Sequence, residues 1–215
     1  MPDKNPSYQK LIQEIKQCQK CPLKKTCHLI VPGEGNIDTQ IMFIGEAPGA
    51  KEDKTGHPFV GAAGKFLEEM LETIQLKRKD VYIANIVKCR PPHNRDPFPE
   101  EIQACWPWLE KQIKIIQPLL IVTLGRHAME KFLPGQKISQ VHGKALRRTI
   151  PELGEQVFYT LYHPAAALYN GSLRQVLIKD FQRIPQVLKI IKKEIQKQKL
   201  QSSFSSQPPE QESLF

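Results

Sequence analysis

Several hallmarks of membrane, secreted and repeat proteins are absent from this sequence. No run of apolar residues is long enough to span a lipid bilayer as a helix. The first segment, Met1 to Gln17, is polar and charged, so it does not match a secretory signal peptide. No internal repeat is visible along the chain. We therefore expect a cytoplasmic protein that is not associated with a membrane.

Cysteine is scarce, and the count of five is odd. Without a secretory signal, an odd number of cysteines argues against a framework of structural disulfides. Metal or cluster ligation explains those that are present better. The remaining composition suits a globular protein, because 215 residues with 40% apolar side chains are enough for one domain with a buried core.

Negative charge is in deficit. The chain has 31 Lys and Arg residues against 22 Asp and Glu residues, which gives a net charge of +9. Such an excess indicates a polyanionic partner. Part of the excess lies between Lys189 and Lys199, and that run is more simply explained as the solvated face of a helix.

Strands and helices alternate along the chain. The segments predicted as strands are 41–44, 81–87, 119–124 and 157–161. The segments predicted as helices are 8–17, 64–74, 99–116, 125–133 and 173–200. This alternation predicts an α/β fold with a parallel sheet. Residues 1–200 are expected to form one domain that includes the N-terminal cysteine segment. Residues 201–215, rich in Ser, Gln and Pro, are expected to be a disordered tail.

The stretch from Ile41 to Gly64 carries the clearest indication of a ligand site. The first strand leads into the turn Gly-Glu-Ala-Pro-Gly at residues 45–49, and a second glycine-containing stretch at residues 56–61 precedes a helix. In open α/β proteins, a connection of this kind forms a pocket at the carboxyl end of a strand. An ordinary connection between a strand and a helix is the alternative.

The cysteines are arranged as a metal centre would require. Cys18 and Cys21 form a C-x-x-C pair, whose two thiolates can reach one centre, and Cys89 and Cys105 follow at a distance. Four thiolates suit either zinc or a [4Fe–4S] cluster, and their spacing does not choose between them. Cys27 is a fifth candidate ligand. Buried, unreactive thiols are the alternative.

A series of motifs follows in a fixed order. They are Gly45-Glu46-Ala47-Pro48-Gly49, Glu52-Asp53, Gly56-x-Pro58-Phe59-Val60-Gly61-x-Ala63-Gly64, Tyr82-Ile83-x-Asn85-Ile86-Val87-Lys88-Cys89-Arg90-Pro91-Pro92-x-Asn94-Arg95, Gly125 and His163-Pro164-Ala165. With these motifs the chain resembles the family 4 uracil-DNA glycosylases, the iron–sulfur branch of the uracil glycosylase superfamily. The resemblance extends from about Cys18 to Ile191.

The resemblance implies a three-layer α/β/α fold around a central four-stranded parallel sheet. It also implies a [4Fe–4S] cluster on Cys18, Cys21, Cys89 and Cys105, with Cys27 as a spare. The implied activity is a step of base excision repair, in which the bond between uracil and deoxyribose is hydrolysed in single- or double-stranded DNA. Free uracil and an abasic site result. The protein is expected to be a monomer associated with the nucleoid.

Three residues are implied in recognition of the base. Phe59 supplies an aromatic face for the ring. Asn85 supplies an amide that accepts from uracil N3–H and donates to O4. His163 donates to O2, where negative charge grows as the glycosidic bond breaks. The alternatives are a core phenylalanine, an asparagine that caps a turn and a structural histidine.

The loop that contains Gly45 and Ala47 is implied to contact the base through its backbone N–H groups. Other branches of the superfamily place an acidic or amide residue where this chain has Ala47. Because alanine cannot activate water, the implied reaction is dissociative, through an oxocarbenium-like sugar. Glu46 is assigned to orienting the base or a water, and Glu52 to excluding the methyl group of thymine. Asp53 is expected to brace the loop.

Contacts to DNA are expected from one apolar and several basic side chains. Leu168 is a candidate wedge that enters the duplex in place of the flipped nucleotide, although a packed leucine at a helix start is the alternative. The candidate phosphate contacts are Lys88, Arg90, Arg95, Lys144, Arg147 and Arg148.

The last five residues, Gln211–Phe215, resemble the short peptides by which bacterial repair proteins bind the sliding clamp. A solvated tail is the alternative. The alternative function for the whole chain is a non-catalytic iron–sulfur module that binds uracil or damaged DNA. An iron–sulfur electron carrier is disfavoured, because such a protein has no use for a pocket the size of a base.

Overall fold

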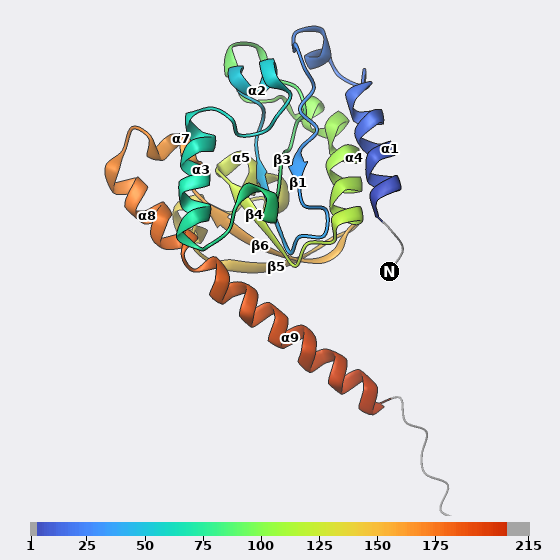
Figure 1. The fold of residues 1–215 in the computed structure, drawn as a ribbon, viewed down its shortest axis with the longest axis vertical. Helices are drawn as coiled ribbons and strands as arrows, with labels where there is room; N and C mark the ends of the chain where they lie inside the picture. Colours follow the sequence, from blue (N-terminus) through green and yellow to red (C-terminus); the bar gives the residue numbers. More distant parts are fainter. Residues whose placement is uncertain (1–3, 206–215) are drawn as a thin grey trace, which may run out of the picture.

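A computed structural model describes residues 4–205, and this part of the chain folds around a six-stranded sheet (Figure 1). The strands are β1 (Glu34–Gly35), β2 (Ile41–Gly45), β3 (Tyr82–Asn85), β4 (Leu120–Leu124), β5 (Ala145–Ile150) and β6 (Gly154–Leu161). Their order across the sheet is β1-β3-β2-β4-β6-β5. The neighbours β3, β2, β4 and β6 are parallel, which confirms the predicted parallel α/β sheet.

Helices precede, connect and follow the strands. They are α1 (Asn5–Lys16), η1 (Pro22–Lys25), α2 (Ala50–Thr55), α3 (Ala62–Thr73), η2 (Arg78–Asp80), η3 (Pro92–Asn94), α4 (Pro99–Ile116), α5 (Arg126–Phe132), α6 (Ile138–Val141), α7 (Pro164–Ala167), α8 (Gly171–Phe181) and α9 (Ile184–Ser205), where η denotes a 3-10 helix. The first four predicted helices correspond to α1, α3, α4 and α5. The helices α2, α6 and α7 are too short to show a helical pattern in the sequence.

The four expected parallel strands are present, and the sheet has two strands more than expected, because an antiparallel strand is added at each edge. The strand β1 pairs with β3, and β5 pairs with β6. The first of these spans only two residues, too few for any periodicity. Most side chains of β5 are exposed, so it lacks the apolar run that marks a buried strand.

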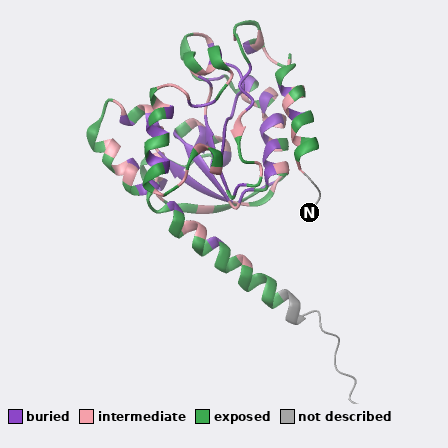
Figure 2. Cartoon of the chain, viewed as in Figure 1, coloured by how far each residue is buried: buried purple, intermediate pink, exposed green. Residues whose placement is uncertain are grey.

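Side chains of the central strands alternate between two apolar cores. Met42 and Ile44 of β2 pack among residues of α1, α4 and α5 on one face of the sheet. Ile41 and Phe43 pack among residues of α3, α8 and α9 on the other face. Both faces are covered, and the buried residues lie between the sheet and these helices (Figure 2). The implied three-layer α/β/α architecture is thereby confirmed.

The single helix predicted over residues 173–200 is wrong, because α8 and α9 divide this stretch between them. Pro185 accounts for the break. Proline has no backbone N–H to donate, and its ring clashes with the carbonyl group four residues earlier. That carbonyl belongs to Phe181, the residue at which α8 ends.

The helix α9 projects from the body of the molecule, near the end of the sheet where the parallel strands begin (Figure 1). Ile184 and Ile191 anchor its first half in the core, and Glu194 pairs with Arg147 of β5. It runs past the expected domain boundary at residue 200. Residues 206–215, including the predicted clamp-binding peptide, lie outside the described residues. Within residues 4–205, no helix has the length and apolar character needed to cross a membrane.

Candidate active site and cysteine centre

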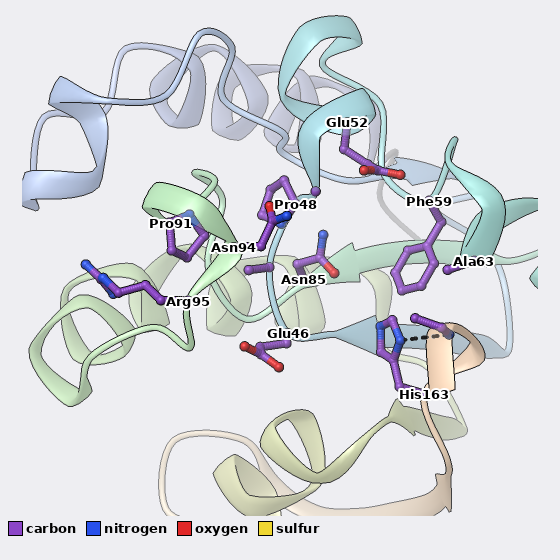
Figure 3. Close-up of a pocket in the computed structure, with 13 residues that line it drawn as sticks. Glu46, Pro48, Glu52, Phe59, Ala63, Asn85, Pro91, Asn94, Arg95 and His163 are labelled. Carbon is purple, nitrogen blue, oxygen red and sulfur yellow. Dashed lines mark hydrogen bonds between the residues drawn. The ribbon is translucent and has the colours of Figure 1, made fainter. Parts of the chain in front are cut away.

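A cavity of about 360 Å³ opens at the carboxyl ends of β2, β3 and β6 (Figure 3). This edge is where open α/β sheets bind ligands. The lining residues are Glu46, Ala47, Pro48, Gly49, Glu52, Phe59, Ala63, Asn85, Pro91, Asn94, Arg95, His163 and Ala165. All the predicted catalytic and substrate-binding residues except Gly45 and Leu168 therefore line one cavity.

Phe59 is held in an uncommon backbone conformation, with φ at 52°. Its ring faces the cavity together with the His163 imidazole (Figure 3), and the two ring centroids are 5.7 Å apart. Gly64, in the first turn of α3, permits this arrangement. A Cβ atom at that position would lie 1.7 Å from the Phe59 carbonyl oxygen. The predicted motif at residues 56–64 thus ends in glycine for a steric reason, because a side chain at Gly64 would collide with the backbone of Phe59.

Glu52 braces the same loop. Its Oε1 accepts hydrogen bonds from the backbone N–H groups of Val60 and Gly61, at 2.9 and 2.8 Å. The carboxylate thus stabilises the loop in addition to lining the cavity. Asp53, from which bracing was expected, is buried and accepts instead from the backbone N–H of His28 at 2.9 Å.

Arg78 of η2 is a residue that sequence reasoning missed. Its Nη1 donates to the carbonyl oxygen of Phe59 at 2.9 Å, and its Nη2 donates to that of Pro58 at 2.6 Å. Nη2 also donates to Glu34 Oε1 at 2.5 Å. No sequence pattern marks this residue, because its partners in the loop are backbone carbonyl groups, which any amino acid provides.

Asn85 ends β3 and points its amide into the cavity (Figure 3). The residue is 2% exposed. Its Oδ1 is the buried side-chain atom that has no hydrogen-bond partner among the described residues. An unsatisfied buried acceptor is costly, so its presence at a cavity wall indicates a ligand that donates to it. Gly45 keeps this space open, because a Cβ there would lie 2.5 Å from Asn85 Oδ1 and 2.7 Å from Phe59 Cζ.

His163 follows β6 and has a defined tautomer. Its Nδ1 accepts a hydrogen bond from the backbone N–H of Ala165 at 3.1 Å. Burial lowers the pKa of His163 to about 4. The imidazole is therefore neutral near pH 7, and the proton resides on Nε2. The Nε2–H of His163 is thus available to donate to a ligand, because the Ala165 N–H contacts only Nδ1.

Glu46 reaches the cavity from the end of β2, next to Ala47. Its carboxyl group is half-buried, and burial raises its pKa. His127 of α5 lies beside it, with Nε2 3.9 Å from Glu46 Oε2 and 3.2 Å from Asp96 Oδ2. Sequence reasoning missed both His127 and Asp96. The Gly125 motif after β4 was the available signal, since it places the next residues at the same sheet edge.

Leu168 does not line the cavity. It is half-buried and packs against the core on the α3 and α8 side. The following residue, Tyr169, is 93% exposed on the connection between α7 and α8. The exposed aromatic side chain of this connection is thus the tyrosine, and Leu168 is only partly exposed, so its role as a wedge stays a prediction.

The predicted phosphate contacts are only partly placed for that role. Lys88 is wrong, because it is 2% exposed and its Nζ donates to the Asn85 carbonyl oxygen at 2.9 Å and to Gln112 Oε1 at 2.7 Å. Arg147 and Arg148 pair with the beginning of β6, away from the cavity, and their contact with phosphates stays a prediction. Arg95 lines the cavity but forms a two-pronged ion pair with the buried Glu101. The remaining two, Arg90 and Lys144, are half-buried and exposed respectively.

Four of the five cysteines surround a second, small cavity. Cys18 and Cys21 come from the segment after α1, Cys89 follows β3, and Cys105 lies in α4. The rest of the lining is largely apolar. Cys27 does not line this cavity, although its Sγ lies 3.1 Å from that of Cys89. These four thiols are the ones predicted as a ligand set.

The environment of the thiols suits a bound cation. Trp108 Nε1 donates to Cys18 Sγ at 3.1 Å, and the backbone N–H of Lys88 donates to Cys105 Sγ at 3.3 Å. Burial raises the pKa of Cys105 to about 11 and also raises those of Cys21 and Cys89. Four thiolates at this position therefore require a positive centre to hold them deprotonated.

Comparisons with known proteins agree with this arrangement. The family described as Uracil DNA glycosylase superfamily matches residues 32–188. Over 184 residues the chain is 48% identical to the Type-4 uracil-DNA glycosylase of Sulfurisphaera tokodaii, covering 83% of each protein. It is 48% identical over 180 residues to that of Archaeoglobus fulgidus, covering 81% of this chain and 89% of the relative. For Thermotoga maritima the identity is 45% over 179 residues, covering 82% and 92%.

The family match includes the segments that line the cavity, from Glu46 to His163, and two of the four clustered cysteines, Cys89 and Cys105. The named relatives are matched over more than four-fifths of their length. The chain therefore belongs to the type-4 uracil-DNA glycosylases of the uracil-DNA glycosylase superfamily.

Proposed function

We propose that this protein is a monofunctional uracil-DNA glycosylase, which hydrolyses the N-glycosidic bond of uracil in DNA and leaves an abasic site for base excision repair. One observation carries the proposal. The unpaired Oδ1 of Asn85 lies buried at the wall of a cavity that Phe59 and His163 also line. A flat base with an N–H on its pairing edge satisfies that acceptor.

Each of these side chains has a defined task on a flipped uracil. The Phe59 ring stacks on the base. The Asn85 amide accepts from N3–H through Oδ1 and donates to O4 through Nδ2. Cytosine is rejected, because it presents an acceptor at N3 and a donor at position 4. Glu52 closes the cavity beside the loop and excludes the thymine methyl group.

Departure of the base is assisted by a neutral donor. The Nε2–H of His163 points at uracil O2 as negative charge accumulates there, and the backbone N–H groups of the Gly45–Gly49 loop add to this stabilisation. No proton needs to be transferred from the imidazole. Ala47 cannot activate water, so the sugar becomes oxocarbenium-like before water adds. Glu46 orients that water and stabilises the cationic sugar.

The clustered thiols hold a [4Fe–4S] cluster on Cys18, Cys21, Cys89 and Cys105. Within residues 4–205, no three cysteine sulfurs lie within 4.8 Å of one another. A zinc ion with Zn–S bonds of about 2.3 Å draws its tetrahedral sulfur ligands to about 3.8 Å from one another. The wider spacing favours the larger cluster. When bound, the cluster supplies cross-linking rather than reaction chemistry, since it joins the segment after α1 to β3 and α4.

The substrate is uracil in single- or double-stranded DNA, and the enzyme acts as a monomer on the nucleoid. On a duplex, Leu168 and the exposed Tyr169 fill the gap left by the flipped nucleotide. A bacterial-type sliding clamp is the second partner, bound through Gln211–Phe215. The charge excess of +9 supports a polyanionic substrate.

The test is release of uracil from a single-uracil oligonucleotide, measured as free base and as alkali-labile sites, with a thymine oligonucleotide as control. We expect Asn85→Ala and His163→Ala each to lower the rate about a hundredfold or more, because each removes a preorganised contact to the transition state. Circular dichroism checks that the variants are folded. Tight binding of uracil-DNA without any free uracil would instead identify the non-catalytic DNA-binding module.

A further inference from the structure

Glu46 has neighbours that the proposed reaction does not yet use. His127, in the first turn of α5, places Nε2 3.9 Å from Glu46 Oε2. The same nitrogen lies 3.2 Å from Oδ2 of Asp96, which precedes α4. Arg126 Nη2 lies 3.4 Å from that Asp96 oxygen. Three segments, which follow β2, η3 and β4, thus contribute side chains to one row. The row begins at Arg126 on the surface and ends at Glu46 in the cavity.

The exposures of these groups decrease toward the cavity. The side chains of Arg126 and Asp96 are 70% and 60% exposed, whereas those of His127 and Glu46 are 30% and 25% exposed. The inner two therefore interact in a less screened environment than the outer two. The 3.9 Å separation is too long for a hydrogen bond, so His127 acts on Glu46 through charge and packing. A half-buried carboxylate beside an imidazole that a second carboxylate holds in place has fewer orientations available.

We propose that His127 is a positioning residue, which directs the Glu46 carboxylate into the cavity while Asp96 holds the imidazole in place. The inference rests on the proposed function, in which Glu46 orients water and stabilises the sugar cation. His127 does not line the cavity. Its effect on the reaction passes through Glu46.

The charged groups that face Glu46 give this arrangement a characteristic pH dependence. Burial raises the pKa of Glu46, His127 of α5 and Arg126 of α5 lower it, and Asp96 raises it. The other ionisable groups at the cavity are engaged elsewhere: Arg95 with Glu101, Glu52 with the loop at Val60, and His163 with Ala165. Loss of His127 therefore leaves Glu46 protonated to a higher pH.

The experiment compares His127→Gln and His127→Phe with the wild-type holoenzyme in single-turnover release of uracil. We expect the maximal rate to fall roughly tenfold to a hundredfold, as misplacement of a reacting group typically causes, while the KM for the oligonucleotide is unchanged. The acid limb of the pH–rate profile should move to higher pH. Asp96→Asn should move this limb to lower pH, since it removes a carboxylate that opposes ionisation of Glu46.

A double-mutant cycle isolates the coupling. In a Glu46→Gln background, His127→Gln should have no further effect on the rate, because its target is gone. His142→Gln is the matched control, since it breaks another His–Asp pair, with Asp180 at 2.6 Å, outside the cavity lining. That variant should keep the wild-type pH profile even if it melts earlier.

The outcomes separate the inference from the proposed function. Absence of uracil release by the wild type would overturn the proposed function. Full activity of Glu46→Gln would remove the role of Glu46 and, with it, that of His127. A strong effect of Glu46→Gln together with additive losses in the double variant would overturn the inference alone, and so would a wild-type pH profile for His127→Gln.

Discussion

The imidazole of His163 has its protonation state set by two different influences. Burial lowers its pKa to about 4, and the backbone N–H of Ala165 occupies Nδ1. The unfolded state, with an ordinary pKa near 6.5, binds the proton more tightly than the folded state does. Protonation therefore opposes folding, and this contribution to stability is present above about pH 6.5 and lost as the pH falls toward 4.

A prediction follows for substitutions at His163. His163→Gln keeps an N–H donor, so we expect it to lose less activity than His163→Ala, which should lose about a hundredfold. Because the imidazole is already neutral above about pH 4, His163→Gln should leave the acid limb of the pH–rate profile unchanged. Single-turnover rates between pH 5 and 8 measure both effects. An acid limb that disappears in His163→Gln would instead show that protonation of His163 itself causes that limb, and hence that its imidazole titrates well above pH 4.

Single residues differ in how far the sequence reveals them. The cavity residues Phe59, Asn85 and His163 belong to motifs, and the structure places them together. Burial, by contrast, depends on distant segments. Lys88 has the same local appearance as an exposed phosphate-binding lysine, yet Gln112 of α4 and the carbonyl group of Asn85 enclose its Nζ.

At the scale of structural elements, the loop from residue 58 to residue 61 depends on contacts from outside itself. Glu52 of α2 accepts from its N–H groups, and Arg78 of η2 donates to its carbonyl groups. Phe59 occupies a left-handed conformation that costs of order 1 kcal/mol or more for a bulky residue. These two clamps offset that cost and keep the ring in the cavity.

We therefore expect Arg78→Leu to lower kcat/KM for uracil release by roughly tenfold or more, because even one hydrogen bond from a charged donor, worth about 1.5–3 kcal/mol, corresponds to at least about a tenfold change. Arg78→Lys should recover part of the loss, since a single ammonium group cannot reach both carbonyl oxygens as the guanidinium does. Arg147→Leu is a control, because it removes a paired arginine of β5 away from the cavity. Equal losses for Arg78→Leu and Arg147→Leu would refute a specific role in the loop.

Elements with strong periodicity are predictable, and those shaped by local exceptions are not. The pattern of residues 99–116 predicts α4 to its bounds, because Pro99 and the two following glutamates mark its start. The predicted helix at 173–200 ignores Pro185, which separates α8 from α9. The edge strands β1 and β5 escape prediction, since pairing with a neighbour defines them more than their own apolar content does.

At the scale of the whole molecule, the cysteine centre joins regions that are far apart in sequence. It brings the segment after α1 against the connection after β3 and against α4. Which cysteines come together depends on contacts between segments that are far apart in sequence. The spacing of Cys18 and Cys21 is visible in the sequence, but only the fold shows that Cys27 lies outside the cavity lining.

A prediction for the whole molecule concerns removal of two ligands from the cysteine centre. Cys18→Ser combined with Cys21→Ser should abolish bound iron and visible absorbance and reduce stability by about 2 kcal/mol or more. In a domain of this size that lowers the melting temperature by roughly 4–8 °C. Cys27→Ser is the matched control and should retain iron and stability. Loss of iron from Cys27→Ser, with retention in the double variant, would reverse the assignment of ligands.

The position of α9 has a consequence for how the enzyme is held while it works. The cavity opens where the parallel strands end, whereas α9 leaves near the place where they begin (Figure 1). A contact made along the exposed second half of α9 would therefore lie far from the cavity mouth. Binding there and entry of a base into the cavity would use separate surfaces of the protein.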